Sequence, residues 1–231
     1  MKLHSTRDAA DRREADFGRR RYAYLRRLMP APAAGARALD CGAGAGELAT
    51  IARELGFEPV CVEIAPGNLR TLREAGLPTV CADLNAPLPV AAESFDLVIL
   101  SDVLEHLPRA EVLLAEVARV LRPGGKCLLS TPNVAYWEYR LRALLGYPPP
   151  VEGRHFRFFT RKHLLRRAKA AGLRLVGRAS HGPVKLVNLV LKPLGGRELW
   201  CRVPAVLETV LGHTFVLLLE KVGSRASGEG E

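Results

Sequence analysis

The sequence lacks long hydrophobic runs, although 48% of its 231 residues are hydrophobic. Its longest apolar runs, such as Phe215–Leu219 and Leu97–Leu100, fall far short of the roughly 18 consecutive residues that a membrane-spanning helix needs. Charged residues make up 25% of the chain, a globular average that excludes a disordered or low-complexity protein. We therefore expect a soluble globular protein with no transmembrane segment.

Cysteine is scarce, and its spacing matches no known framework. The five cysteines, at positions 41, 61, 81, 127 and 201, include no Cys-x-x-Cys pair, so neither a disulfide framework nor a zinc site is indicated. The N-terminus also lacks the apolar segment of a secretory signal. We predict a reduced, cytoplasmic compartment.

Charge is unevenly distributed along the chain. The formal net charge is +10 at pH 7, yet residues 37–137 hold 8 basic and 13 acidic residues, whereas residues 138–178 hold 11 basic and 2 acidic residues. Such a basic segment is consistent with a solvated face, with an anionic or phosphate-bearing substrate, or with RNA. The charge alone leaves these interpretations open.

Between residues 37 and 131, short apolar runs alternate with segments of helical period, which is typical of βαβ units and a parallel sheet. Residues 132–159 are predicted to be irregular, and a helix is predicted over Arg161–Ala171. The sequence therefore indicates one α/β sheet of seven strands. The predicted strands are Arg37–Asp40, Pro59–Glu63, Thr79–Ala82, Phe95–Ser101, Lys126–Thr131, Leu173–Ser180 and Thr214–Lys221.

A glycine-rich segment, Leu39–Glu47, joins the first predicted strand to the first helix. Its glycines let the backbone approach a ligand at the helix N-terminus. From Gly44 to Ala49 the segment also fits the loose dinucleotide pattern G-x-G-x-x-A, which makes a nicotinamide or flavin enzyme an alternative.

Two carboxylates at later strand ends favour a different nucleoside ligand. Glu63 ends the second strand, where a carboxylate can accept hydrogen bonds from both ribose hydroxyls. Asp83 ends the third strand, where it can accept one from an adenine amino group. Each alone is also consistent with a solvated strand-end residue, but the two together favour adenosine binding.

Five segments together resemble the class I S-adenosylmethionine-dependent methyltransferases, over residues 37–221. They are Leu39–Glu47, Val62-Glu63, Ala82–Leu84, Phe95–Leu107 and Leu121–Gly125. The resemblance implies a Rossmann-like, doubly wound, mostly parallel sheet of order 3-2-1-4-5-7-6 with the last strand antiparallel. It also implies S-adenosylmethionine as the cofactor, bound across the carboxyl edge.

The resemblance assigns cofactor contacts to particular residues. Asp40 would lie near the methionine amino group, Gly42, Gly44 and Gly46 would shape the methionine and ribose pocket, Glu63 would hold the ribose, Ile64 would pack on adenine, Asp83 and Leu84 would flank it, and Ser101 would lie beside the cofactor.

His106 follows the fourth strand and is the best candidate for a general base. Methyl transfer is an in-line displacement, so a base is needed only if the acceptor must lose a proton. The alternative is a histidine with a local packing or capping role at a helix start.

A metal site is a further alternative. Asp102, Glu105 and His106 have the spacing D-x-x-E-H, and His155 follows later. This set is similar to that of the metal-dependent small-RNA 3'-terminal 2'-O-methyltransferases, whose divalent ion grips the ribose hydroxyls. Asp102 replaces the glutamate of that pattern, and its side chain is shorter by one methylene. We therefore favour an active site without a metal ion and keep these four residues as the alternative.

Seven of the 14 aromatic residues fall within residues 136–159, interleaved with arginines. We predict that this segment is a substrate lid in which Tyr136, Trp137, His155 and Arg157 contact the acceptor. The alternative is that its aromatic residues dock the segment onto the core. Thr131–Val134 and His155–Thr160 resemble the subset of methyltransferases, of types 11 and 23, that includes the methionine biosynthesis protein W group.

The predicted organisation is a basic N-terminal cap helix (1–36), a methyltransferase domain (37–221) and a flexible tail (222–231). An apolar insertion, residues 181–213, is predicted to form a substrate wall, a dimer surface or a membrane-surface contact.

The predicted function is methyl transfer to a small or medium, anionic acceptor, with oxygen favoured over nitrogen or carbon. We expect a monomer or homodimer. RNA is a less favoured partner, and a non-catalytic module that binds S-adenosylmethionine is a further alternative.

Overall fold

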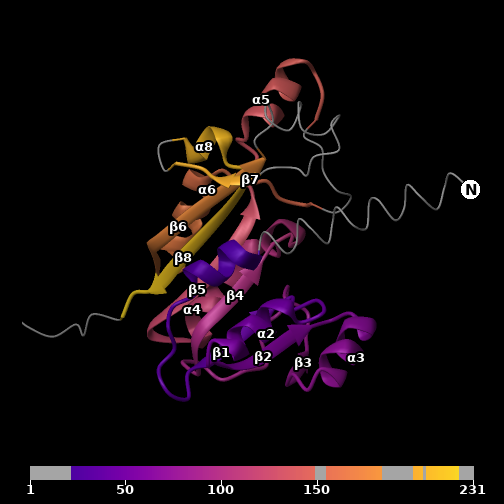
Figure 1. Cartoon of the computed structure of the whole chain (residues 1–231), viewed down its shortest axis with the longest axis vertical. Coiled ribbons are helices and arrows are strands. Elements are labelled where there is room, and N and C mark those ends of the chain that lie inside the picture. The colour runs from indigo at the N-terminus through magenta and orange to yellow at the C-terminus, as the bar shows by residue number, and fades with distance from the viewer. Residues whose placement is uncertain (1–21, 149–154, 184–199, 205–206, 224–231) are drawn as a thin grey trace, which may run out of the picture.

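The computed structural model describes residues 22–148, 155–183, 200–204 and 207–223. They form a sheet of order β3-β2-β1-β4-β5-β8-β6-β7 with helices on both faces (Figure 1). The strands are β1 (Arg37–Cys41), β2 (Glu58–Glu63), β3 (Thr79–Cys81), β4 (Phe95–Ser101), β5 (Leu121–Pro132), β6 (Leu173–Pro183), β7 (Trp200–Arg202) and β8 (Thr214–Lys221).

The predicted Rossmann-like, doubly wound fold is confirmed. Strands β1 to β5 pair in parallel, and β8, which is the seventh predicted strand, runs antiparallel between β5 and β6. The short strand β7 lies inside the predicted insertion and pairs antiparallel with the last three residues of β6. It therefore extends the predicted seven-strand order at one edge without changing it.

The helices flank the sheet in two layers. Residues 22–28, α2 and α3 cover one face, and α4 and α6 cover the other. Within the described ranges, every helix is too short or too polar to cross a bilayer. The bounds are α2 (Glu47–Glu54), α3 (Pro66–Glu74), the 3₁₀-helix η1 (Leu104–His106), α4 (Ala110–Val120), α5 (Trp137–Leu144), α6 (Arg161–Ala170) and α8 (Glu208–Leu211).

Strand β4 shows why the central strands read as apolar runs. Leu97 and Ile99 are buried in the cluster under residues 22–28 and α2, whereas Val98 and Leu100 are buried in the cluster under α4 and α6. A parallel strand covered by helices on both faces must be apolar at successive positions. The continuous run therefore fixes β4 at the centre of the sheet.

Helix α5 differs from the predicted irregular stretch. None of its residues is buried, so its apolar side chains do not face the core, and the prolines at positions 148–150 favoured irregular structure.

Gly46 begins α2 in a left-handed conformation, with φ at +92°. A Cβ at this position would lie 2.7 Å from both Leu72 of α3 and Leu77. A Cβ atom does not fit in this space. The absence of a side chain at Gly46 therefore allows α2 to pack closely against α3.

We predict that Gly46→Ala lowers the free energy of unfolding by about 2–4 kcal/mol, because a left-handed backbone cost adds to an overpacking cost. Gly76→Ala is the matched control, since Gly76 also has a positive φ of +64° but a Cβ there would meet no atom within 4 Å. The control should lose only about 1–2 kcal/mol. Equal losses in urea unfolding would contradict the packing role.

Candidate active site

The carboxyl ends of β1, β2, β4 and β5 lie at one edge of the sheet, which we call the C-terminal rim. In open α/β sheets ligands bind at this edge. The candidate residues from the sequence lie along it or in the segments that follow it.

Gly42 and Gly44 lie in the turn after β1. The amides of Gly42 and Ala43 donate to the Val62 carbonyl at 2.8 and 3.2 Å, which ties the turn to the end of β2. A Cβ on Gly42 would come within 2.9 Å of Val103, whereas a Cβ on Gly44 would meet no atom within 4 Å. The turn therefore packs tightly at Gly42 and leaves space at Gly44.

Asp40 is a buried carboxylate at the end of β1, with 2% of its surface exposed. Its Oδ2 atom has no hydrogen-bond partner among the described residues. The pKa of Asp40 is raised to about 7, mainly by burial. A hydrogen bond from the Ala49 amide lowers this pKa, whereas the negative charges of nearby Glu47 and Glu63 raise it further. A cationic group placed here would relieve this cost.

At the end of β2, the pKa of the Glu63 carboxylate is shifted in the opposite direction. Its Oε1 accepts hydrogen bonds from the amides of Ile64 (2.7 Å) and Ala65 (2.9 Å), and its Oε2 accepts from the Gly44 amide (3.0 Å) and the Asn68 side chain (3.3 Å). Burial raises the pKa of Glu63, but these donors outweigh it, and the net pKa is lowered.

The contacts of Glu63 tie the turn after β1 to the turn after β2. Because a carboxylate accepts about four hydrogen bonds, a ribose hydroxyl would have to replace one of these donors, and the longest contact is the one from Asn68. The sequence predicted the carboxylate at this position, but it carried no signal for the bond from Gly44.

The remaining predicted cofactor residues differ in their surroundings. Ile64 is 58% exposed, so an apolar side chain stands open beside Glu63. Asp83 is exposed, and its Oδ1 accepts from the amide and side chain of Asn85, both at 2.9 Å. The Ser101 hydroxyl lies 3.2 Å from that of Ser130.

Two predicted residues of the pocket remain. Leu84 lies beside the turn, with its Cδ1 atom 3.7 Å from a Cβ built on Gly42. Gly46 packs on α3, as described above, and so lies away from the space at Gly44.

Three titratable side chains meet where β4 ends. Glu105, His106 and His155 each offer one ligand atom, and these atoms lie within 4.8 Å of one another. The two imidazole rings meet edge to face, with centroids 4.8 Å apart. An imidazole pair beside a carboxylate can accept a proton or bind a divalent cation.

Glu105 assembles this group through both its backbone and its side chain. Its carbonyl accepts the amides of Phe156 (2.8 Å) and Arg157 (3.1 Å), which places the neighbouring His155 against His106. Its Oε2 accepts the Thr131 hydroxyl at 3.0 Å, and the residue is 2% exposed. The approach of a residue 50 positions later in the chain could not be derived from spacing alone.

Asp102, the fourth predicted metal ligand, lies outside the group that the structure brings together. Its Oδ1 accepts the Ser130 hydroxyl at 2.7 Å, so the carboxylate is directed toward β5. The shorter aspartate side chain is consistent with this placement.

In the predicted lid segment, Tyr136 is fully buried and packs edge to face on Tyr139 and His213. The Tyr139 hydroxyl lies 2.9 Å from Nε2 of His213, a residue that the sequence analysis did not single out. These contacts anchor the segment to the start of β8. Trp137, by contrast, is 36% exposed.

Arg157 also anchors the segment. Its guanidinium donates to the Pro108 carbonyl and lies 3.5 Å from the Glu111 carboxylate. The substrate contacts proposed for Tyr136, Trp137, His155 and Arg157 stay predictions.

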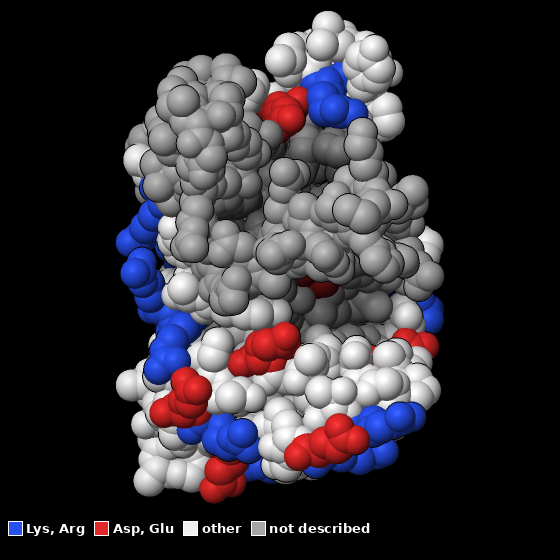
Figure 2. Space-filling view, turned by 45° about the vertical axis from the view of Figure 1, so that its right-hand side comes forward, with Lys and Arg blue, Asp and Glu red and all other residues white. Residues whose placement is uncertain are grey.

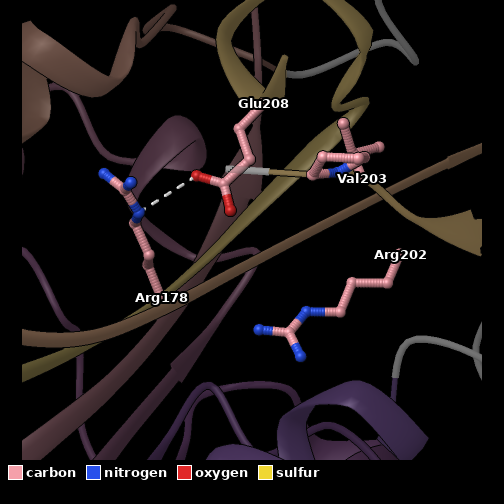
Figure 3. A pocket seen from close by; sticks show the side chains of 5 residues that line it. Arg178, Arg202, Val203 and Glu208 are labelled. Atoms are coloured by element: carbon pink, nitrogen blue, oxygen red, sulfur yellow. Dashed lines mark ion pairs between the residues drawn. The ribbon is translucent and has the colours of Figure 1, made fainter. Parts of the chain in front are cut away.

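A cavity of about 370 Å³ lies further along the sheet, beside β6 and α8 (Figure 3). Its carboxylate, Glu208, is 3% exposed and pairs with Arg161 at 3.0 Å and Arg178 at 3.3 Å. The exposed Arg202 lines the same cavity. The buried carboxylate of Glu208, paired with two arginines, links α8 to α6 and β6. The cavity shares no lining residue with the group of Glu105, His106 and His155 at the end of β4.

Comparisons with known proteins identify the family. A family model described as a methyltransferase domain matches residues 12–177. The ubiquinone biosynthesis O-methyltransferase of Idiomarina loihiensis is 30% identical over 70% of this chain and 68% of that protein. The malonyl-(acyl-carrier protein) O-methyltransferase of Methylococcus capsulatus is 32% identical over 91% of this chain and 78% of that protein.

Two further comparisons are informative only about part of the chain or about the fold. A match to the ubiquinone biosynthesis O-methyltransferase of Xanthomonas oryzae is 38% identical but covers only 43% of this chain and 44% of that protein. The S-adenosylmethionine-dependent methyltransferase structure from Mesorhizobium loti has a TM-score of 0.62 at 19% identity, over 86% of this chain and 96% of that one, and so shows the shared fold.

The chain belongs to this methyltransferase family, and its cofactor is S-adenosylmethionine. The residues at the rim fit this cofactor. The buried acceptor atom of Asp40 suits an ammonium group, the space at Gly44 allows close approach of a ligand to the backbone, and the exposed Ile64 suits a planar base.

We predict that Asp40→Asn makes the cofactor-free protein more stable at pH 8 by about 2–4 kcal/mol, and much less so near pH 4. The folded-state pKa of about 7 lies above the ordinary value of 3.8. The protonated form therefore stabilises the fold at low pH, and this stability is lost as the pH rises from about 4 to 7.

Chemical unfolding at both pH values measures this effect. Asp83→Asn is the control, because the Asp83 side chain is exposed just after β3, two strands away from β1. An Asp40→Asn variant that is no more stable than the wild type at pH 8 would contradict the burial cost.

Proposed function

We propose that the protein transfers a methyl group from S-adenosylmethionine to an oxygen atom of a small or medium, anionic acceptor. The observation that carries this proposal is the paired imidazoles of His106 and His155 at the end of β4, one strand from the turn after β1. The two sequence relatives described above that match over two thirds or more of both chains are named O-methyltransferases, which supports oxygen as the methylated atom.

When bound, S-adenosylmethionine supplies a methyl group activated by a positively charged sulfur. The acceptor oxygen attacks the methyl carbon, the carbon–sulfur bond breaks, and its electron pair stays on sulfur, which leaves S-adenosylhomocysteine. The acceptor hydroxyl proton passes to an imidazole, for which His106 is our first choice and His155 the second.

The rim residues hold the cofactor in this proposal. The carboxylate of Asp40 neutralises the ammonium group of the methionine part. Glu63 accepts a hydrogen bond from a ribose hydroxyl in place of the one from Asn68, and Ile64 packs on adenine. Most of the acceleration comes from positioning the reacting atoms in line. Gly42, Gly44, Asp83, Leu84 and Ser101 complete the proposed pocket, and Gly46 contributes through the position of α2.

The anionic character of the acceptor is supported by the basic segment 138–178, with 11 basic and 2 acidic residues. The free cysteines Cys41, Cys61, Cys81 and Cys127 support a reduced, cytoplasmic location. A monomer or homodimer stays our proposal for the assembly.

Labelled methyl transfer tests the proposal on matched phenols, carboxylic acids and amines. We expect methylated oxygen in the products, and an anionic acceptor should have a lower KM than its neutral analogue. Glu63→Gln should weaken S-adenosylhomocysteine binding at least tenfold in calorimetry, because charged hydrogen bonds are lost. Methylation of nitrogen alone, or cofactor binding without turnover on any acceptor, contradicts the proposal.

A second candidate function uses a divalent cation at Glu105, His106 and His155. The observation that favours it is that one ligand atom from each lies within 4.8 Å of the others. A cation there would bind two neighbouring acceptor oxygens, as at the 2'- and 3'-hydroxyls of an RNA terminus. The displaced position of Asp102 leaves this candidate second.

For this candidate we predict that manganese(II) raises turnover at least tenfold, and that His155→Ala weakens manganese binding at least tenfold. His163→Ala is the control, because His163 lies on α6 and accepts a hydrogen bond from Arg167 at 3.0 Å. Calorimetry measures binding, and RNA with a 3'-hydroxyl or a 3'-phosphate tests the acceptor. Full turnover in the presence of a chelator excludes the metal.

A further inference from the structure

Helix α5 and its C-terminal residue carry large apolar side chains that are exposed in the part of the chain that the structure describes. Trp137, Leu141, Leu144 and Leu145 are 36%, 48%, 84% and 65% exposed. Monomeric proteins rarely leave such a contiguous group of large apolar side chains in water without a use for it. We call these four residues the α5 stripe.

The α5 stripe faces away from the body of the protein. Its positions, 137, 141, 144 and 145, share one side of a helix. The opposite side contacts the body through Tyr139, whose hydroxyl lies 2.9 Å from His213. Figure 1 shows α5 at the top of the molecule, beyond the end of the sheet.

A basic groove lies beside the start of α5. It is a hollow of about 550 Å³, and its charged lining residues are all cations, namely Arg140, Arg161, Lys162, Arg166 and Lys169. Below, the term basic groove means this hollow together with these five residues. Lys162, Arg166 and Lys169 share one side of α6, at spacings of four and three residues.

Most of this charge has no ion-pair partner within the described ranges. Arg161 pairs with the buried Glu208 at 3.0 Å. Among the residues that the structure describes, no carboxylate lies within ion-pair distance of Lys162, Arg166 or Lys169. A groove lined by several cations without carboxylate partners attracts phosphate groups.

We propose that the α5 stripe and the basic groove dock the protein on a membrane surface that contains anionic phospholipids. The stripe enters the headgroup region, and the groove binds lipid phosphates. Helices that lie in the interface combine these two features, an apolar face and cations that meet anionic lipids. Figure 2 shows the described part of the projecting top as largely uncharged, with both basic and acidic side chains at its base.

Charge argues for a lipid surface over a second copy of this chain. A twofold contact through the stripe would bring two basic grooves close together, and like charges across an interface are unfavourable. A soluble phosphate ester could fill the groove, but it would leave the stripe in water. A phospholipid surface satisfies both features at once.

Docking in this way has a geometric consequence for the site. Helix α5 begins five residues after the end of β5, at the same rim where Glu105 and His106 lie. The docked protein would therefore approach the bilayer with the rim that holds the candidate active site. Docking itself does not depend on which acceptor is methylated.

Vesicle flotation of the full chain tests the proposal. We expect at least tenfold stronger binding to vesicles of phosphatidylglycerol and phosphatidylcholine than to phosphatidylcholine alone, with binding falling as salt is raised. Leu141→Ser/Leu144→Ser and Lys162→Gln/Arg166→Gln should each weaken binding at least tenfold. All four side chains are exposed, so folding should be preserved.

Arg70→Gln/Arg73→Gln on α3 is the matched control, since it removes two exposed cations elsewhere and should change vesicle binding less than twofold. In a Trp200→Phe background, Trp137 is the only tryptophan, and its emission should shift to shorter wavelength with anionic vesicles. Unchanged S-adenosylhomocysteine affinity in the docking variants separates failure of docking from failure of the proposed methyl transfer.

Several results would overturn the proposal. They are equal binding to neutral and anionic vesicles, loss of binding in the α3 control, and unchanged binding of the stripe variant. Inorganic pyrophosphate binding that needs Lys162 and Arg166, without any vesicle binding, would assign the groove to a soluble phosphate ester. A dimer broken by Leu141→Ser/Leu144→Ser would assign the stripe to a second copy.

Discussion

Parallel pairing of β1, β4 and β5 is the constraint on which the candidate site depends. Ala38 to Asp40 pair with Leu97 to Ile99, and Ser101 pairs with Ser130. Because these strands run in one direction, their carboxyl ends meet at one rim. Asp40, Ser101 and Thr131 come from distant parts of the chain, and the register brings them to the same rim of the sheet. The helices on both faces keep that register by burying the central strands on both sides.

Most of the fold could be predicted because central strands of this kind are apolar throughout. β4 and β8 have the predicted bounds, since their residues pack against buried clusters. β5 begins earlier than predicted, at Leu121, because Pro123 and the two glycines that follow indicated a break rather than a strand start. α5 was missed because a helix without buried residues lacks the core-facing pattern that sequence analysis detects.

The site could be predicted only to the level of single residues. Carboxylates at strand ends are visible in a sequence, so Glu63 was found in this way, whereas Asp40 was assigned through the family resemblance. Their electrostatic difference was not visible, since it arises from burial at Asp40 and from four donors at Glu63. Spacing likewise placed Asp102 with Glu105 and His106, whereas a bond from Ser130 directs Asp102 to β5.

Glu105 connects residues 155–157 to β5 by two separate routes. Its carbonyl receives two amides from the segment that carries His155, and its carboxylate receives the hydroxyl of Thr131 on β5. A ligand that pushes this segment outward would strain the first pair of bonds and shift the backbone from which the carboxylate extends. The positions of His155 and His106 are thereby coupled through a single residue, Glu105.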